Sequence, residues 1–152
     1  MTASLNLFTA APELTKAFLD FSNQVEASGL EKPLLELVKI RASQLNHCAN
    51  CLNMHTFEAR QAGETEQRLH LIAAWREAPC YSERERAALA WTEHLTLIAD
   101  KGAPGEDARA ALAAQFSEAE QVKLTMMINS INGWNRLAVG FGLFAANLGW
   151  KE

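Results

Sequence analysis

The residues best suited to chemistry stand together in one ten-residue stretch, NHCANCLNMH, at positions 46–55. It holds two cysteines three positions apart, Cys48 and Cys51, and a histidine, His55, four positions after the second cysteine. Cysteines with this spacing can form a redox couple, supply half of a zinc site or attach a haem. Haem attachment needs a histidine directly after the second cysteine, and Leu52 stands there instead, which excludes it.

Zinc and redox chemistry differ in what else they require. A structural zinc site needs four ligands, whereas Cys48, Cys51 and His55 offer three from one helix, and no second closely spaced cysteine pair follows. A thioredoxin-type motif would lie where a strand meets a helix, and no segment of the chain has the alternating pattern of a strand. A redox couple carried by a helix is therefore favoured, with zinc as the alternative.

A helix beginning at about Cys48 brings the three reactive side chains to one side. At 100° per residue, Cys48, Cys51 and His55 fall within an arc of about 100°, facing the core or a cleft in it. Cysteines at i and i+3 have Cα atoms on the order of 5 Å apart, which suits a disulfide. The helix dipole and free N–H groups of the first turn favour a thiolate there, and Asn46 is expected to cap the helix.

The elements that must position this stretch are all expected to be helices. Apolar residues recur at helical spacing, and capping boxes at Ser82–Glu85 and Ser117–Glu120 mark two helix starts. The expected helices cover 14–29, 33–45, 48–62, the region of 69–73, 82–98, an alanine-rich segment after 107, and 117 towards 148. No linker divides the 152 residues. The sequence predicts one all-α domain over residues 1–152, a bundle of about seven helices.

Composition excludes several classes of protein. With 49% hydrophobic and 21% charged residues, the chain resembles an ordinary soluble globular protein. A net charge of -4 without a Lys/Arg cluster argues against nucleic acid as a partner. The longest nearly apolar run, 137–146, is about ten residues, too short for a membrane span. Three cysteines without a recognisable export signal indicate a reducing compartment, so we expect a cytoplasmic protein.

The same residues carry a resemblance to a known family. Glu36, eleven residues, Cys48-Ala-Asn-Cys51, three residues and His55 resemble the core motif of AhpD-type alkylhydroperoxidases, which belong to the carboxymuconolactone decarboxylase-like superfamily. The segments around this motif, residues 36–55, are also similar: ELVKIRASQLNHCANCLNMHTFEARQAG, SERERAALAWTEHLT and INGWNRLAVGFG. The resemblance implies an all-helical homo-oligomer, a trimer or hexamer, that reduces hydroperoxides through a CxxC dithiol without haem, metal or another cofactor.

The resemblance also implies roles for four residues. Cys51 is the expected peroxide-attacking residue and Cys48 its resolving partner, whereas the helix-terminus argument favours Cys48 as the more acidic thiol. His55 is the expected base. Glu36 is the carboxylate that orients or deprotonates it, although by position alone Glu36 would be an ordinary exposed helix glutamate. An external dithiol reductant or a reductase protein would then reduce the Cys48–Cys51 disulfide.

Three positions lie outside this pattern. Some family members carry a histidine immediately before the second cysteine, but here the residue is Asn50, which can hydrogen-bond but cannot take up a proton near neutral pH. His47 is a candidate to replace that histidine, or else a plain exposed loop residue. Cys80 matches no motif position and is expected to have no role.

Two alternatives to a peroxidase come from other functional classes. One is a decarboxylase or isomerase that acts on a lactone, as in the superfamily's namesake, whose members look different at the motif and generally lack paired cysteines. The other is a non-enzymatic redox-sensing protein, whose CxxC pair only switches between dithiol and disulfide.

Overall fold

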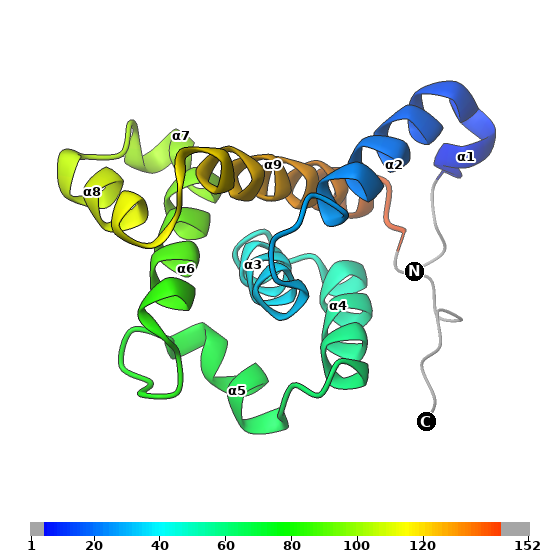
Figure 1. Cartoon of the computed structure of the whole chain (residues 1–152). Coiled ribbons are helices and arrows are strands. Elements are labelled where there is room, and N and C mark those ends of the chain that lie inside the picture. Colours follow the sequence, from blue (N-terminus) through cyan, green and yellow to red (C-terminus); the bar gives the residue numbers. More distant parts are fainter. Residues whose placement is uncertain (1–4, 144–152) are drawn as a thin grey trace.

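Every regular element in residues 5–143, the part of the chain described by this computed structural model, is a helix (Figure 1). The helices are α1 (Leu7–Ala10), α2 (Pro12–Glu26), α3 (Lys32–Leu45), α4 (Ala49–Gln61), α5 (Glu66–Leu71), the 3-10 turn η1 (Ile72–Ala74), α6 (Glu83–Thr96), α7 (Ile98–Lys101), α8 (Glu106–Gln115) and α9 (Glu118–Gly140). The predicted all-α class is therefore confirmed.

The described residues contain nine α-helices, so the prediction of about seven was too low. The two unpredicted helices, α1 and α7, have four residues each, which is one turn and too short to show a helical period. The helix expected over 82–98 ends at Thr96, and α7 follows after Leu97. The last helix ends at Gly140, and the predicted continuation towards Leu148 runs beyond the described residues.

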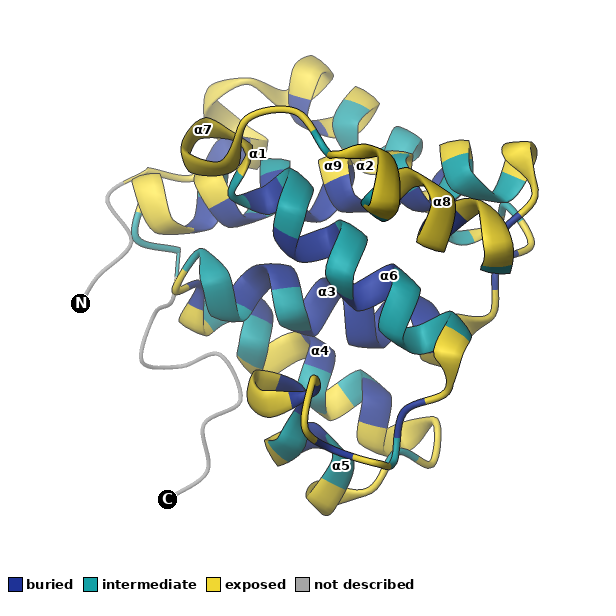
Figure 2. Ribbon diagram, turned by 90° about the vertical axis from the view of Figure 1, so that its left-hand side faces the viewer, coloured by how far each residue is buried: buried dark blue, intermediate teal, exposed yellow. Residues whose placement is uncertain are grey.

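Helix α3 lies at the centre of the molecule and positions everything around it. It packs against α4, α6 and α9, which surround it in Figure 1. Nine of its fourteen residues are buried, and Figure 2 shows this concentration of buried residues in the middle of the fold. A polar residue on almost any side of α3 is therefore enclosed by other helices.

A tight bend joins α3 to α4 and packs the second helix against the first. Asn46 ends α3, and its backbone N–H bonds to the carbonyl of Ala42. His47 follows with φ +54°, a left-handed conformation that is uncommon outside glycine but less so for histidine. Cys48 is the N-cap of α4, and its Sγ accepts a hydrogen bond from the Cys51 backbone N–H at 3.4 Å. The prediction that Asn46 caps α4 was therefore wrong, because the bend is too short to separate the two helix ends.

The longest helix, α9, packs across the bundle. It has 23 residues, but neither it nor any other helix within residues 5–143 is long and apolar enough to cross a membrane. Gly133 allows close packing against α2, since a Cβ at this position would lie 2.5 Å from Cζ of Phe18. A larger residue at position 133 would therefore force the Phe18 ring or one of the two helices to move.

Candidate dithiol site

The two motif cysteines form a buried pair at the start of α4. Their Sγ atoms lie 2.7 Å apart, both thiols are free, and the residues are only 1% and 2% exposed. Cys48 and Cys51 pack in one apolar cluster with residues from α3 and α9, namely Ala42, Ile131 and Ala138. The predicted orientation of both cysteines towards the core is confirmed.

The two thiols differ strongly in acidity. The two thiols are hydrogen-bonded to each other, and donation from Cys51 to the ionised sulfur of Cys48 lowers the pKa of Cys48 to about 7 against the opposing effect of burial; the Cys51 backbone N–H contributes further. That same hydrogen bond, together with burial and the negative charge of Cys48, raises the pKa of Cys51. Cys48 is therefore the more acidic thiol of the pair, as the helix-terminus argument predicts.

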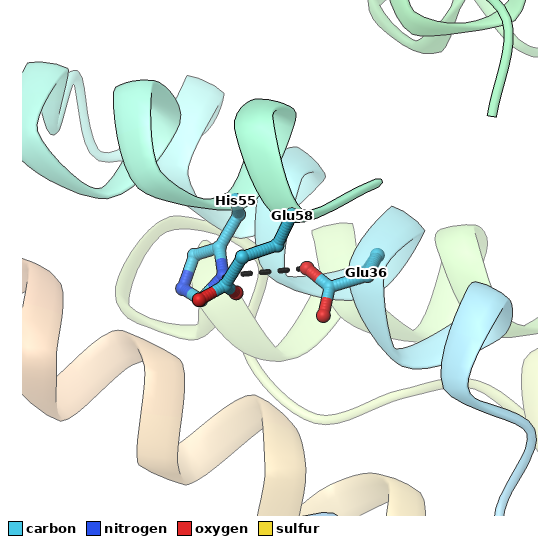
Figure 3. A group of neighbouring side chains, drawn as sticks. All are labelled: Glu36, His55 and Glu58. Atoms are coloured by element: carbon cyan, nitrogen blue, oxygen red, sulfur yellow. Dashed lines mark hydrogen bonds and ion pairs between the residues drawn. The ribbon is translucent and has the colours of Figure 1, made fainter. Parts of the chain in front are cut away.

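Glu36 and His55 meet between the two helices. Oε2 of Glu36, on α3, lies 3.3 Å from Nδ1 of His55, on α4. Figure 3 shows the His55 and Glu58 side chains next to each other, with Glu36 facing them from the neighbouring helix. Glu36 is 2% exposed, so the expectation from position alone, an exposed helix glutamate, was wrong. The carboxylate is in place to orient the imidazole, as the family resemblance implies.

Two charged residues complete this arrangement. Oε2 of Glu58 lies 3.1 Å from the same Nδ1 of His55, and the Lys39 ammonium lies 2.7 Å from Oε1 of Glu36 and also pairs with Glu26. Burial alone would raise the pKa of Glu36, but hydrogen bonds with His55 and Lys39 outweigh it and lower that pKa. Burial would lower the pKa of Lys39, yet its bonds to Glu26 and Glu36 raise it. Glu36 and Lys39 are therefore both charged.

The cysteine pair and the histidine–glutamate pair are neighbours without a direct bond. Within residues 5–143, His55 makes no hydrogen bond to either sulfur. It lies one turn after Cys51 on α4. The S–H of Cys51 has the largest effect on the pKa of Cys48, and nearby His55 is among the further groups that lower it. The structure thus brings the four predicted site residues together as two adjacent pairs.

A metal ion is the alternative use of the same side chains. Glu36, His55 and Glu58 each offer one ligand atom within 4.8 Å of the others. The Lys39 ammonium already binds the other oxygen of Glu36, and its positive charge opposes a cation there. The predicted zinc alternative needed Cys48 and Cys51 with His55, and these do not form a ligand cluster within the described residues.

Separate cavities border the histidine and the cysteine pair. A cavity of about 410 Å³ borders His55, with a charged wall from α3 and α4 and an apolar wall that includes Leu19, Met127 and Trp134. A second cavity, of about 270 Å³, borders Cys48. Asn50 lines both cavities, and the exposed His47 lines the second.

Sequence reasoning missed three buried or partly buried polar residues at the site. Lys39 stands three positions after Glu36, and Glu58 three positions after His55. Residues at this i, i+3 spacing are neighbours on a helix surface, so the spacing could have indicated both contacts. Asn135 lies in α9, nearly ninety positions from the cysteines, and only the tertiary fold brings it close. Cys80, for which no role was expected, is a half-buried loop residue.

An all-helical fold with a buried CxxC pair at one helix terminus, beside a glutamate–histidine pair, defines the class of protein. The chain belongs to the carboxymuconolactone decarboxylase family, whose model matches residues 12–94. It is 40% identical over 147 residues to the uncharacterized protein YdfG of Bacillus subtilis, an alignment that covers 97% of this chain and 99% of YdfG.

Solved structures share the fold. A protein of unknown function from Agrobacterium tumefaciens, provisionally described as the antioxidant defence protein AhpD, is 47% identical and superposes with a TM-score of 0.89 over 93% of this chain and 96% of that one. An uncharacterized peroxidase-related protein from Silicibacter sp. TM1040 is 24% identical, with a TM-score of 0.74 over 84% and 67% of the two chains. At this identity, the second likeness concerns the fold alone.

Proposed function

We propose that this protein is a thiol-dependent peroxidase, an alkylhydroperoxidase that reduces hydroperoxides through a dithiol/disulfide cycle at Cys48 and Cys51. The observation that carries the proposal is the pair of sulfurs 2.7 Å apart, of which Cys48 has a pKa of about 7. Such a thiol is about half ionised at neutral pH, whereas an ordinary one is ionised by only a few per cent. The A. tumefaciens relative, provisionally described as an antioxidant defence protein, supports the same class of reaction.

In the first step, the Cys48 thiolate attacks one peroxide oxygen. An S–O bond forms and the O–O bond breaks, so that Cys48 becomes a sulfenic acid and the alkoxide leaves as alcohol after taking a proton from water. This assignment differs from the order that the family resemblance implies, in which Cys51 attacks. Two observations favour Cys48: its lowered pKa and its position on a cavity wall.

In the second step, Cys51 displaces the oxygen from Cys48. Once Cys48 is a sulfenic acid, the negative charge that raises the pKa of Cys51 is gone. His55, one turn away, accepts the Cys51 proton, and the carboxylate of Glu36 stabilises the resulting imidazolium. The Cys51 sulfur then attacks that of Cys48, the S–O bond breaks, and the oxygen leaves as water with the proton of the sulfenic acid and the proton that the His55 imidazolium returns.

An external dithiol completes the cycle by thiol–disulfide exchange with the Cys48–Cys51 disulfide. The reductant gives up two electrons and two protons and becomes a disulfide itself. Dithiol reductants are maintained in the cytoplasm, and we propose that the protein acts there.

The proposal is tested by hydroperoxide consumption with dithiothreitol as the reductant. Cys48→Ser and Cys51→Ser should each abolish turnover, whereas the matched control Cys80→Ser should retain it. After one equivalent of peroxide, Cys51→Ser should carry a dimedone-reactive sulfenic acid on Cys48. If dimedone instead traps a sulfenic acid on Cys51 in the Cys48→Ser protein, Cys51 is the residue that attacks the peroxide. If peroxide oxidises Cys48 and Cys51 to the disulfide but is not consumed catalytically, the protein is a redox sensor and not a peroxidase.

We further propose that the protein is a homo-oligomer, a trimer or hexamer. Large apolar side chains lie exposed on several helices, among them Leu14 on α2, Phe57 on α4, and Val122 and Val139 on α9. Association of identical chains would remove them from water. Light scattering at micromolar concentration should give a trimer or hexamer mass, and a monomer mass would contradict the proposal.

A further inference from the structure

Helix α9 contributes one polar side chain to the apolar surroundings of the dithiol. Asn135 is completely buried. Ile131 and Ala138, one turn before and after it on the same face of α9, belong to the cluster that encloses Cys48 and Cys51. An uncharged polar residue fully enclosed at such a place needs partners for all of its hydrogen-bonding atoms.

Two hydrogen bonds fix the orientation of the Asn135 amide. Its Nδ2 donates to Oγ of Ser43 at 3.0 Å, and its Oδ1 accepts from Nδ2 of Asn46 at 2.9 Å. Ser43 in turn donates its own hydroxyl proton to the carbonyl of Lys39, so its oxygen is available to Asn135 only as an acceptor. The amide of Asn135 therefore cannot be reversed without losing both bonds.

The second N–H of the Asn135 amide is not used in either of these two hydrogen bonds. Among residues 5–143 it has no oxygen or nitrogen acceptor, since Ser43 takes only one of the two Nδ2 protons. Asn135 lies between Ile131 and Ala138 on the face of α9 that packs against the cysteines, so the Cys48 and Cys51 sulfurs are the acceptors that this face offers. After the larger effects of Cys51 and of burial, Asn135 lowers the pKa of Cys48, and it lowers the pKa of Cys51 as well.

We propose that Asn135 is a positioning residue of the dithiol, whose oriented amide N–H holds the Cys48 and Cys51 sulfurs and stabilises negative charge on them. The proposal adds a residue to the site of the proposed peroxidase, but it concerns the thiols alone. It can therefore be tested without a peroxide, and the two proposals can fail separately.

Asn132 provides a matched control on the same helix. It is also buried, and it also belongs to this amide network, because its Oδ1 accepts from Asn46 at 2.9 Å and its Nδ2 donates to Thr96 at 3.0 Å. It is not among the main groups that shift the pKa of either cysteine. Replacing either asparagine removes a buried amide, but only one replacement removes the N–H next to the sulfurs.

The experiment is the pH profile of thiol reaction with 2,2′-dithiodipyridine in reduced protein that carries Cys80→Ser. Asn135→Ala should raise the midpoint of the Cys48 profile by about one to two pH units, the value of a lost hydrogen bond to a charged group. Ser43→Ala, which only frees the amide to turn, should raise it by less. Asn132→Ala should leave the midpoint where it is.

Circular dichroism of each variant establishes that it is folded before its profile is interpreted. A folded Asn135→Ala protein with an unchanged midpoint would overturn the proposal, as would an Asn132→Ala midpoint that rises equally. If Asn135→Ala does not fold, the proposal is tested with Ser43→Ala. An unchanged midpoint of the Cys48 profile in Ser43→Ala would then contradict the positioning role of Asn135.

Discussion

Replacement of Cys51 by alanine removes the S–H group that most strongly lowers the pKa of Cys48. The backbone N–H of residue 51 still donates to Sγ of Cys48 in this variant, and the amide of Asn135 remains. Burial, which opposes ionisation, remains too. We therefore expect the pKa of Cys48 to rise from about 7 to the ordinary thiol value of about 8.5.

The size of the effect on reactivity follows from these two values. At pH 7 the thiolate fraction of Cys48 falls from about one half to about 3%, roughly 15-fold, which corresponds to about 1.6 kcal/mol. The more basic thiolate is intrinsically about four- to sixfold more nucleophilic towards a disulfide reagent. The net rate at pH 7 should therefore fall only about three- to fourfold, while the rate at high pH should rise above that of the wild type.

The reaction rate with 2,2′-dithiodipyridine between pH 5 and 10 measures both changes. The proteins carry Cys80→Ser so that only Cys48 and residue 51 contribute. Cys51→Ser is the matched comparison, because its hydroxyl can still donate to Cys48 and should keep the midpoint well below that of Cys51→Ala. Equal midpoints in the two variants, or a wild-type midpoint near 8.5, would refute the assignment of the thiolate to Cys48.

Three further predictions concern the charged residues. His55→Gln should slow disulfide formation after a peroxide pulse by about 10²–10⁴-fold, because the base is lost. Glu36→Gln should act in the same direction but less strongly, because the base is only weakened. Rapid-quench mass spectrometry measures the rate, and unchanged rates would show that Glu36 and His55 do not relay the proton. Lys39→Met should lower the free energy of unfolding in urea by about 3–5 kcal/mol, since it leaves the buried Glu36 carboxylate without its ammonium partner. The double variant with Glu36→Gln should recover much of the loss, and simple additivity of the two single changes would show that the two residues are not coupled. Because the pKa of Glu36 is lowered from 4.5 on folding, its ionised form contributes stability above pH 4.5, and this contribution is lost as the pH falls through the folded-state pKa. The stability of Glu36→Gln should therefore fall less steeply in acid than that of the wild type. Parallel curves of stability against pH would argue against a lowered pKa of Glu36.

The cysteines and the histidine could be located from the sequence because their geometry is local. Residues 48, 51 and 55 belong to one helix, and a helical period is enough to place them on one side. Glu36 needed the family resemblance. Its own helix, KPLLELVKIRASQL, is enclosed on nearly all sides by α4, α6 and α9, and this enclosure buries even its charged residues. Periodicity within one segment cannot reveal how many neighbours that segment will have.

The remaining differences have similar causes. One-turn helices such as α1 and α7 are formed by local caps and turns, which leave no repeating pattern in the sequence. Asn46 was expected to cap the start of α4 but instead ends α3. The bend between the two helices is so short that the sequence alone does not show to which helix end Asn46 belongs. Asn135 could not be associated with the cysteines because its contact depends on α9 crossing α3 and α4.

The closeness of the two sulfurs also bears on damage by excess oxidant. A sulfenic acid can react with a second peroxide to give a sulfinic acid, which most cells cannot reverse. That reaction is bimolecular and slows with dilution of the oxidant, whereas capture by a sulfur 2.7 Å away is intramolecular. Well-oriented intramolecular reactions have effective concentrations on the order of 10⁵–10⁸ M, far above any peroxide concentration in a cell. The pair should therefore form a disulfide instead of being overoxidised, and its lifetime under oxidative stress should be set by the supply of reductant and not by the dose of peroxide.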